Sequence, residues 1–215
     1  MQTENAALTI QQWLSPVFPV GAFAYSHGLE GAAAAKWVTD EASLQAWLSE
    51  LLRHGSGRCE AVWLRQGYTA RDGAALQRLD AEARAFAICR TREQESLRQG
   101  AAFARTLREV WQLEIPDVVL PLAVGAGANA QGFDIEQIVP LYLHAFVSNL
   151  IGAAQRLLPI GQMTGQLVLT ALQSDCLAVA RETRSAGCEA LCSSVFLSDI
   201  ASMQQEALKT RIFQS

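Results

Sequence analysis

The stretch QIVPLYLHAFVSNLIGAAQ, residues 137–155, decides the fold of this chain. It is a run of nineteen uncharged residues between Glu136 and Arg156. A run of that length could cross a bilayer. However, it contains His144 and Asn149, and polar side chains of this kind are costly in lipid. We therefore expect a buried central helix here, and no membrane span.

A second apolar segment, Ile160 to Thr183, follows this helix after a turn built on Pro159 and Gly161. Two consecutive apolar helices joined by a short turn would form a hairpin at the centre of the core. No long stretch alternates polar and apolar residues, as a half-buried strand would. The 215 residues are therefore predicted to form one all-α domain, a helical bundle around a buried helix hairpin.

Four further segments have helical character on the N-terminal side of this hairpin. They are residues 6–14, a helix beginning at Thr39 with an apolar face through Leu52, residues 59–70, and the long segment 73–111. The last one interleaves arginines and acids with Ala, Leu and Phe. Such a pattern usually marks a solvated helical face, although a surface for an acidic partner is the alternative.

The bulk composition excludes several classes of protein. A net charge of −4 and a pI near 5.4 argue against a nucleic-acid binder. The N-terminus MQTENAALTI has neither the basic region nor the apolar run of a signal peptide. Five cysteines at irregular spacing do not form a disulfide framework. We therefore expect a cytoplasmic protein.

No motif for catalysis or nucleotide binding stands out. GAGANA, residues 125–130, matches G-x-G-x-x-A, but Pro121 precedes it where a strand would be needed, so a packed helix is the better interpretation. No phosphate-binding G-x-x-x-x-G-K-[ST] loop occurs. Cys188 and Cys192 could share a helix face and contact nickel transiently, yet two thiolates are too few for a structural metal site. We expect no tightly bound cofactor.

Two unusual segments lie near the chain ends. Leu14 to Glu30 reads LSPVFPVGAFAYSHGLE, and Pro16 and Pro19 prevent a helix from continuing through it. After Gly21 the composition again favours a helix, which would present the side chains that follow. At the other end, Ile212 and Phe213 lie where little core remains to be joined. Residues 208–215 either fold back on the domain or form a docking tail.

The first of these segments closely resembles the N-terminal signature of the urease accessory protein family UreF, in the pattern SPxxPxGxFxYSxGLE. The tail is similar to the family's D-x-x-x-M-x-H-E followed by R-L-F-R-S, except that Gln205, Ile212 and Gln214 stand for the family's His, Leu and second Arg. YLHAFVSNLIGAAQRLLPIGQ, residues 142–162, is similar to the family's middle segment. The three blocks occur in the family's order.

The resemblance implies an all-α homodimeric maturation factor that is not itself an enzyme. Such a factor would assemble with the UreD (UreH) scaffold, the GTPase UreG and apo-urease, modulate GTP hydrolysis and assist nickel delivery, without nucleic-acid or membrane partners. Aromatic residues and arginine most often anchor interfaces. We place the partner contacts on both unusual segments, at Pro19, Gly21, Phe23, Tyr25, His27, Glu30, Asp199, Met203, Glu206, Arg211 and Phe213.

Two other functions remain open from the sequence. One is an all-α enzyme whose catalytic residues converge only in the fold, for example in a deep pocket lined by His27, Glu30 and Asp199. The other is a helical adaptor of an unrelated complex.

Overall fold

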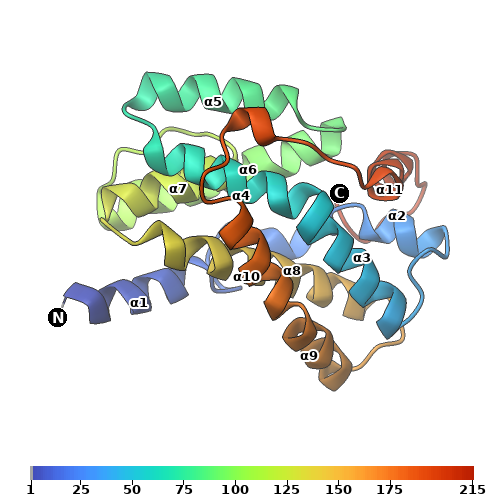
Figure 1. The fold of residues 1–215 in the computed structure, drawn as a ribbon. Helices are drawn as coiled ribbons and strands as arrows, with labels where there is room; N and C mark the ends of the chain where they lie inside the picture. Colours follow the sequence, from blue (N-terminus) through green and yellow to red (C-terminus); the bar gives the residue numbers. More distant parts are fainter. Residues whose placement is uncertain (1) are drawn as a thin grey trace.

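The computed structural model describes residues 2–215, and within that range the fold is built from helices with no β-strand (Figure 1). The all-α prediction is therefore confirmed. The α-helices are α1 (Gln2–Trp13), α2 (Leu29–Ala34), α3 (Glu41–His54), α4 (Ser56–Thr69), α5 (Gly73–Ala85), α6 (Arg90–Trp111), α7 (Leu120–Ala130), α8 (Ile135–Leu157), α9 (Gln162–Ala171), α10 (Gln173–Glu182) and α11 (Phe196–Glu206). Two 3-10 turns, Ala22–Ala24 and Cys188–Ala190, complete the set within residues 2–215.

Helix α8 lies at the centre of the molecule and packs against α2, α4, α9 and α10. Its core-facing residues include Leu143 and Val147, both fully buried. Among the helices of residues 2–215, α8 alone is long and apolar enough to cross a membrane, but half of its apolar window is buried inside the fold. The predicted central helix is thus confirmed. The second arm of the hairpin is two helices, because the predicted helix 160–183 is broken at Leu172.

Helices α4 and α7 pack closely against each other because glycines line their contact. A Cβ atom at Gly125 would collide with the carbonyl oxygen of Leu64, and one at Gly67 would collide with that of Leu122. The GAGANA segment is therefore a packed part of α7, as expected, and does not form a nucleotide-binding turn.

Aromatic side chains hold the proline-bounded break in place. The ring of Phe18, between the two prolines, lies 5.1 Å from that of Phe103 in α6. Trp13 at the end of α1 packs edge-on against the same phenylalanine at 5.4 Å and against Trp111 at 5.7 Å. Aromatic pairs at such distances stabilise a fold beyond their buried area, so the break has a defined course.

The helix that the composition predicts after Gly21 begins only at Leu29, as α2. Ala22–Ala24 is a 3-10 turn, and His27 and Gly28 then adopt left-handed backbone conformations with φ of 58° and 80°. Such angles end a right-handed helix, and glycine adopts them readily. A side chain at Gly28 would also collide with Ser202 of α11. Consequently Glu30 is the one predicted contact residue in this segment that lies on α2.

Helix α11 lies across α2, and the chain end folds back beside both (Figure 1). α11 begins at Phe196, so Ser198 and Asp199 are in its first turn and do not cap it. Its inner face, through Ala201, Ser202 and Gln205, is buried. Its outer face carries exposed apolar side chains. This arrangement brings the two unusual segments of the sequence together.

Candidate functional site: the 22–30 segment, helix α11 and the chain end

Glu30 binds the backbone of the chain end. Its Oε1 accepts a hydrogen bond from the amide of Ile212 at 2.7 Å, and its Oε2 accepts one from the amide of Phe213 at 3.0 Å. Glu30 as a residue is 7% exposed, and a buried carboxylate requires donors of this kind. Glu30 thus fixes the position of the last residues, which lie 182 positions later in the sequence.

Backbone hydrogen bonds continue this contact beyond Glu30. The amide of Ser26 donates to the carbonyl oxygen of Ser215 at 2.8 Å, and the amide of Gln214 donates to that of Ala24 at 2.8 Å. Ser26 Oγ donates to Ser215 as well, at 2.5 Å. The segment 24–26 and the last two residues therefore pair directly. We call Ser26, Glu30 and Gln205 the tail-binding site.

Phe213 is the apolar anchor of the tail, with 3% of its surface exposed. The guanidinium of Arg156, at the end of α8, lies 4.2 Å from the centre of its ring. The same group donates to the carbonyl oxygen of Phe23 at 2.7 Å. A cation over an aromatic face is attractive, so Arg156 connects the 22–24 turn with the tail.

Two of the departures from the family pattern lie at this site. The side-chain amide of Gln205 is within hydrogen-bond distance of Ser26 Oγ and donates to Glu30 Oε2 at 3.2 Å. Gln214 accepts a hydrogen bond from Arg98 through its side chain, at 3.0 Å. Both glutamines therefore have partners in this fold.

Glu206 connects α11 with α6. Its carboxylate accepts hydrogen bonds from the amide and the hydroxyl of Thr91, at 2.9 Å and 3.0 Å. Thr91 lies in the first turn of α6, whose amides have no partner within the helix. The hydrogen bond from the Thr91 amide lowers the pKa of Glu206. Glu206 thus caps α6 from outside.

A buried polar cluster lies beneath α11, next to the tail. His27 Nε2 is 2.6 Å from Ser56 Oγ at the start of α4, and its Nδ1 is 3.7 Å from Glu95. Glu95 also forms an ion pair with Arg92 and accepts a hydrogen bond from Ser215. Burial, followed by the charge of Arg92, lowers the pKa of His27 to about 4. The imidazole is therefore neutral at physiological pH.

The other charged groups of the cluster, Glu60, Glu95 and Arg92, contact one another. Burial would raise the pKa of Glu95, but Arg92 and His27 together hold it at about 2. Glu60 accepts a hydrogen bond from the Tyr142 hydroxyl at 2.7 Å and lies 3.8 Å from Arg92. Burial raises the pKa of Glu60, and Arg92 opposes that shift. Arg92 thus lies between two carboxylates and balances the charge of one of them.

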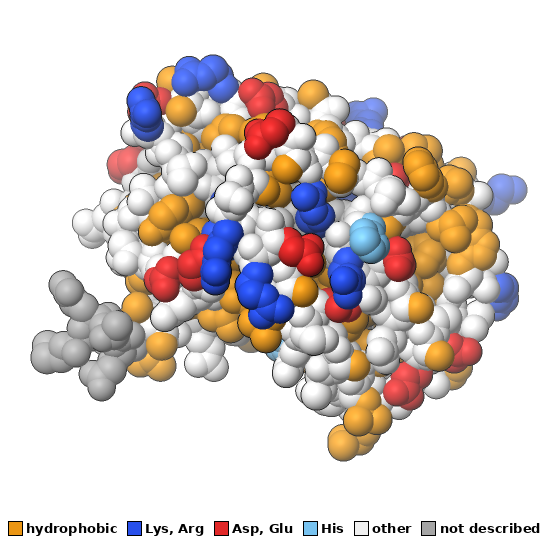
Figure 2. Space-filling view, viewed as in Figure 1, with side chains coloured by type: hydrophobic (Ala, Val, Ile, Leu, Met, Phe, Trp, Pro, Cys, Tyr) orange, Lys and Arg blue, Asp and Glu red, His pale blue; other side chains and the backbone are white. Residues whose placement is uncertain are grey.

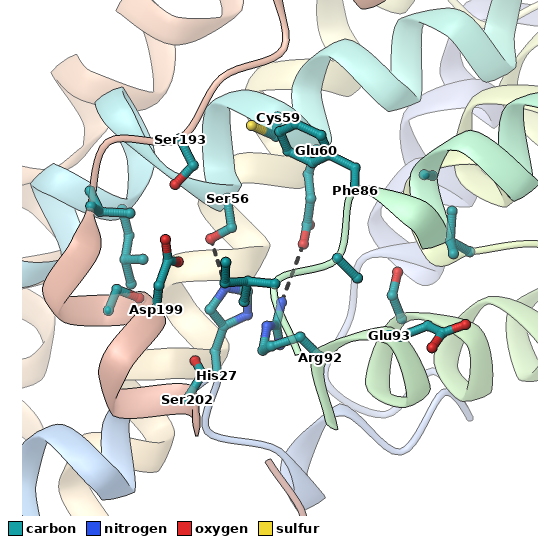
Figure 3. A pocket seen from close by; sticks show the side chains of 18 of the residues that line it. His27, Ser56, Cys59, Glu60, Phe86, Arg92, Glu93, Ser193, Asp199 and Ser202 are labelled. Carbon is teal, nitrogen blue, oxygen red and sulfur yellow. Dashed lines mark hydrogen bonds and ion pairs between the residues drawn. The ribbon is translucent and has the colours of Figure 1, made fainter. Parts of the chain in front are cut away.

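A pocket of about 520 Å³ opens above this cluster, between α11, α4 and the connection from α5 to α6 (Figure 3). His27, Ser56, Glu60 and Arg92 form part of its lining, and Asp199 contributes from α11. Around them are apolar side chains, including Trp63 and Phe86. We call this cavity the α11 pocket. His27 and Asp199 line it as the enzyme alternative required, but Glu30 does not.

The predicted contact residues divide into two groups. Tyr25, His27, Glu30 and Phe213 are buried and contact other parts of this chain. The others are accessible to solvent. Gly21 and Asp199 are partly exposed, and five are exposed: Pro19, Phe23, Met203, Glu206 and Arg211. All lie on or beside α2, α11 and the chain end, but whether they bind a partner stays a prediction.

Several residues of this site were not singled out from the sequence. They are Ser26, Arg92, Glu95, Arg156 and Gln205, the last noted only as a departure from the family pattern. Arg92 and Glu95 belong to the segment expected to be a solvated face, which is wrong for them because they point inward from α6. Glu95, Gln99 and Phe103 are spaced four residues apart and lie on the buried face of α6. This helical spacing could have indicated from the sequence that Glu95 points inward.

The two neighbouring cysteines do not share a helix face. Cys188 begins a 3-10 turn, and Cys192 follows it in an extended stretch. Within the part of the chain that the structure describes, no three His, Cys, Asp or Glu side chains gather as a metal-binding group. Transient nickel contact at Cys188 and Cys192 therefore stays a prediction without a defined metal-binding geometry.

The chain is similar to urease accessory proteins along its whole length. The UreF family model matches residues 38–173. The urease accessory protein UreF of Roseobacter denitrificans is 41% identical over 215 residues, covering 100% of this chain and 96% of the relative. That of Cereibacter sphaeroides is 43% identical over 211 residues, covering 98% of this chain and 99% of the relative. That of Bradyrhizobium diazoefficiens is 40% identical, covering 99% and 93%. The chain belongs to the UreF family of urease accessory proteins.

Proposed function

We propose that this chain is a cytoplasmic maturation factor of urease. As a homodimer, it would assemble with a UreD (UreH)-type scaffold and a UreG-type GTPase on apo-urease, modulate GTP hydrolysis and assist nickel insertion. It would carry no catalytic step and hold nickel at most transiently. Membership of a family of urease accessory proteins supports the general role.

The observation that carries the proposal is the apolar outer face of α11. Phe196, Leu197, Ile200 and Met203 are 41% to 71% exposed, and Figure 2 has hydrophobic side chains gathered over the α11 edge, at the right of the view. Contiguous exposed apolar surface marks interaction sites. Because α11 packs on α2 and the folded tail pairs with residues 24 and 26, one partner could contact α11, the tail and the 22–30 segment together.

Reconstitution tests this proposal directly. Urease subunits are co-expressed with the other accessory proteins, with and without this chain, and nickel-dependent urease activity is measured. We expect activity to require the chain. Equal activity in its absence would contradict the proposal. Light scattering of the purified chain tests the homodimer.

Glu30 offers a more local test. Glu30→Ala should weaken urease activation or the effect on UreG, measured as phosphate release in the assembled complex, while the dimer persists. The physical reason is that the tail loses the acceptor of two backbone amides. A fully active Glu30→Ala protein would exclude this role.

A serine hydrolase is the second candidate, and one observation favours it. Ser56, His27 and Glu95 lie in a row beside the α11 pocket, as nucleophile, base and orienting acid would. Against it, a pKa of about 4 makes His27 a weak base, and Glu95 is already bound by Arg92 and Ser215. A fluorophosphonate probe, which labels activated serines, tests this candidate. Labelling of the wild-type chain that is lost in Ser56→Ala would favour the hydrolase. We expect no labelling.

A further inference from the structure

The α11 pocket contains one carboxylate without a partner. Asp199 projects from the first turn of α11 into the cavity, opposite Phe86 and Glu93 (Figure 3). Among residues 5–215, no hydrogen bond or ion pair involves its carboxylate. Burial raises the pKa of Asp199, opposed by the more distant charge of Arg92. Asp199 is partly exposed, so its hydration is reduced but not lost, and no protein donor replaces the missing part.

Every other charged group that lines the pocket has a partner in the chain. Glu93 pairs with Arg84 at 2.9 Å, and Arg92 lies between Glu60 and Glu95. His27, on the pocket floor, is neutral because its pKa is about 4. The lining thus holds three carboxylates and two guanidinium groups. With Glu95, which shares Arg92 with Glu60, four carboxylates stand against two guanidinium groups in and beneath the pocket, and Asp199 is the one of the four without a hydrogen bond or ion pair to residues 5–215.

The mouth of the pocket is apolar on both sides. Phe196, Ile200 and Met203 from α11 and Phe86 and Ile88 from the α5–α6 connection line the cavity, and each is more than 40% exposed. Trp63 lies further inside and is buried. A ligand of this pocket therefore needs an apolar body and a positively charged group that can reach Asp199.

We infer that the α11 pocket receives an arginine side chain of the partner protein, carried on an apolar segment that covers the outer face of α11. This inference rests on the proposed function, since it specifies the chemistry of that partner. The guanidinium would bind the carboxylate of Asp199, and its aliphatic stem would pack between the apolar walls.

Arginine fits this site better than lysine for two reasons. Its guanidinium is less strongly hydrated, so it loses less on entering a largely apolar cavity, and it can form two parallel hydrogen bonds with one carboxylate. It also stacks on aromatic faces, which Phe86 and Phe196 offer at the mouth. The volume of about 520 Å³ is within the usual range of binding pockets, roughly 300–1,000 Å³.

The first experiment uses the full chain without its partner. Butylguanidinium and its neutral isostere butylurea are titrated into ¹⁵N-labelled protein, and amide shifts of the 193–203 and 86–93 segments are followed. We expect butylguanidinium to bind at least about fivefold more tightly, and Asp199→Asn to abolish that preference. Equal binding of the two probes, or shifts confined to other segments, would overturn the inference.

The second experiment measures affinity for a UreD-type protein. Asp199→Asn should raise the dissociation constant about tenfold or more, because it leaves the partner's guanidinium buried without its counter-charge. Glu109→Gln is the matched control: it removes the same charge from an exposed site near the end of α6 and should leave the affinity unchanged. An unchanged affinity of Asp199→Asn would contradict the inference.

Double-mutant cycles identify the group that occupies the pocket. Each surface arginine and lysine of the partner is replaced by alanine and combined with Asp199→Asn. One arginine should couple with Asp199, so that its loss costs little in the Asp199→Asn background. Coupling to a lysine, or to no basic residue, would overturn the assignment. If the wild-type chain binds no UreD-type protein, the proposed function fails. The titration with butylguanidinium and butylurea then still shows whether the α11 pocket binds a guanidinium group.

Discussion

Two carboxylates on neighbouring helices, Glu30 and Asp199, have opposite environments. Glu30 is buried in the tail-binding site and accepts hydrogen bonds from two backbone amides and from Gln205. Asp199 is partly exposed in the α11 pocket and accepts none from residues 5–215. A buried carboxylate with its own donors holds together the segments that supply them, whereas a partly exposed carboxylate without a protein donor can accept one from a partner. The comparison separates the part of this surface that holds the protein together from the part open to a partner.

Removing the tail should have the largest effect. Deletion of Thr210 to Ser215 removes Phe213 from its buried position and leaves Glu30 without its backbone donors. We expect capture of the UreD-type partner to be lost in a pull-down, while circular dichroism still reports a folded helical core. Undiminished capture by the truncated chain would refute a role of the tail in docking.

Acidification should weaken the fold through His27, the buried imidazole on the floor of the α11 pocket. Its pKa is lowered from 6.5 to about 4, so below pH 6.5 the unfolded chain binds a proton that the folded chain does not. Stability should therefore fall by roughly 3 kcal/mol as the pH drops from 6.5 to 4. The groups facing the imidazole are Ser56, Glu95, Arg92 and Phe146.

Urea unfolding at a series of pH values checks this expectation. His27→Gln should flatten the dependence between pH 6.5 and 4, whereas His54→Gln, a change at an exposed histidine, should retain the wild-type slope. The pKa of Glu95, lowered to about 2, contributes a separate loss that begins below about pH 4.5. Equal slopes for His27→Gln and the wild type would exclude the histidine as the cause.

The matched substitutions Glu30→Gln and Asp199→Asn should differ in their effect on stability. Glu30→Gln weakens charge-assisted hydrogen bonds to the tail and should cost about 2 kcal/mol. Asp199→Asn removes a charge that has no partner among residues 5–215 and should stay within about 0.5 kcal/mol of wild type. Urea unfolding at pH 7 measures both. A loss of similar size in both proteins would mean that Asp199 has a structural partner after all.

Glu206→Gln should have a small effect, well below that of Glu30→Gln. It weakens a cap on the first turn of α6 that involves Thr91, and caps of this kind contribute about 0.5–2 kcal/mol. Because glutamine can still accept one hydrogen bond, we expect a loss near the lower limit, seen as a small decrease of the melting temperature. A loss above that of Glu30→Gln would show that the tail-binding site contributes less than we infer.

The amino-acid sequence by itself determined the helical architecture. The uncharged run at 137–155 predicts a buried helix at any place in a soluble fold, because periodicity and hydrophobicity are local properties. The prolines at 16 and 19 predict a break for the same reason. The sequence pattern also identified both ends of the chain as unusual and similar to those of UreF proteins.

Only the tertiary structure decided how these segments meet. The tail of this chain folds back, and its Phe213 is buried, because Glu30 and Ser26, more than 180 residues away, supply the acceptors and donors for its backbone. Partners so distant in sequence leave no periodic signal. The left-handed residues His27 and Gly28 delay the expected helix to Leu29, and Gly28 lies so close to Ser202 of α11 that a side chain there would collide with it. Likewise, the contrast between Glu30 and Asp199 depends on which donors lie nearby, and spacing along the chain does not specify that.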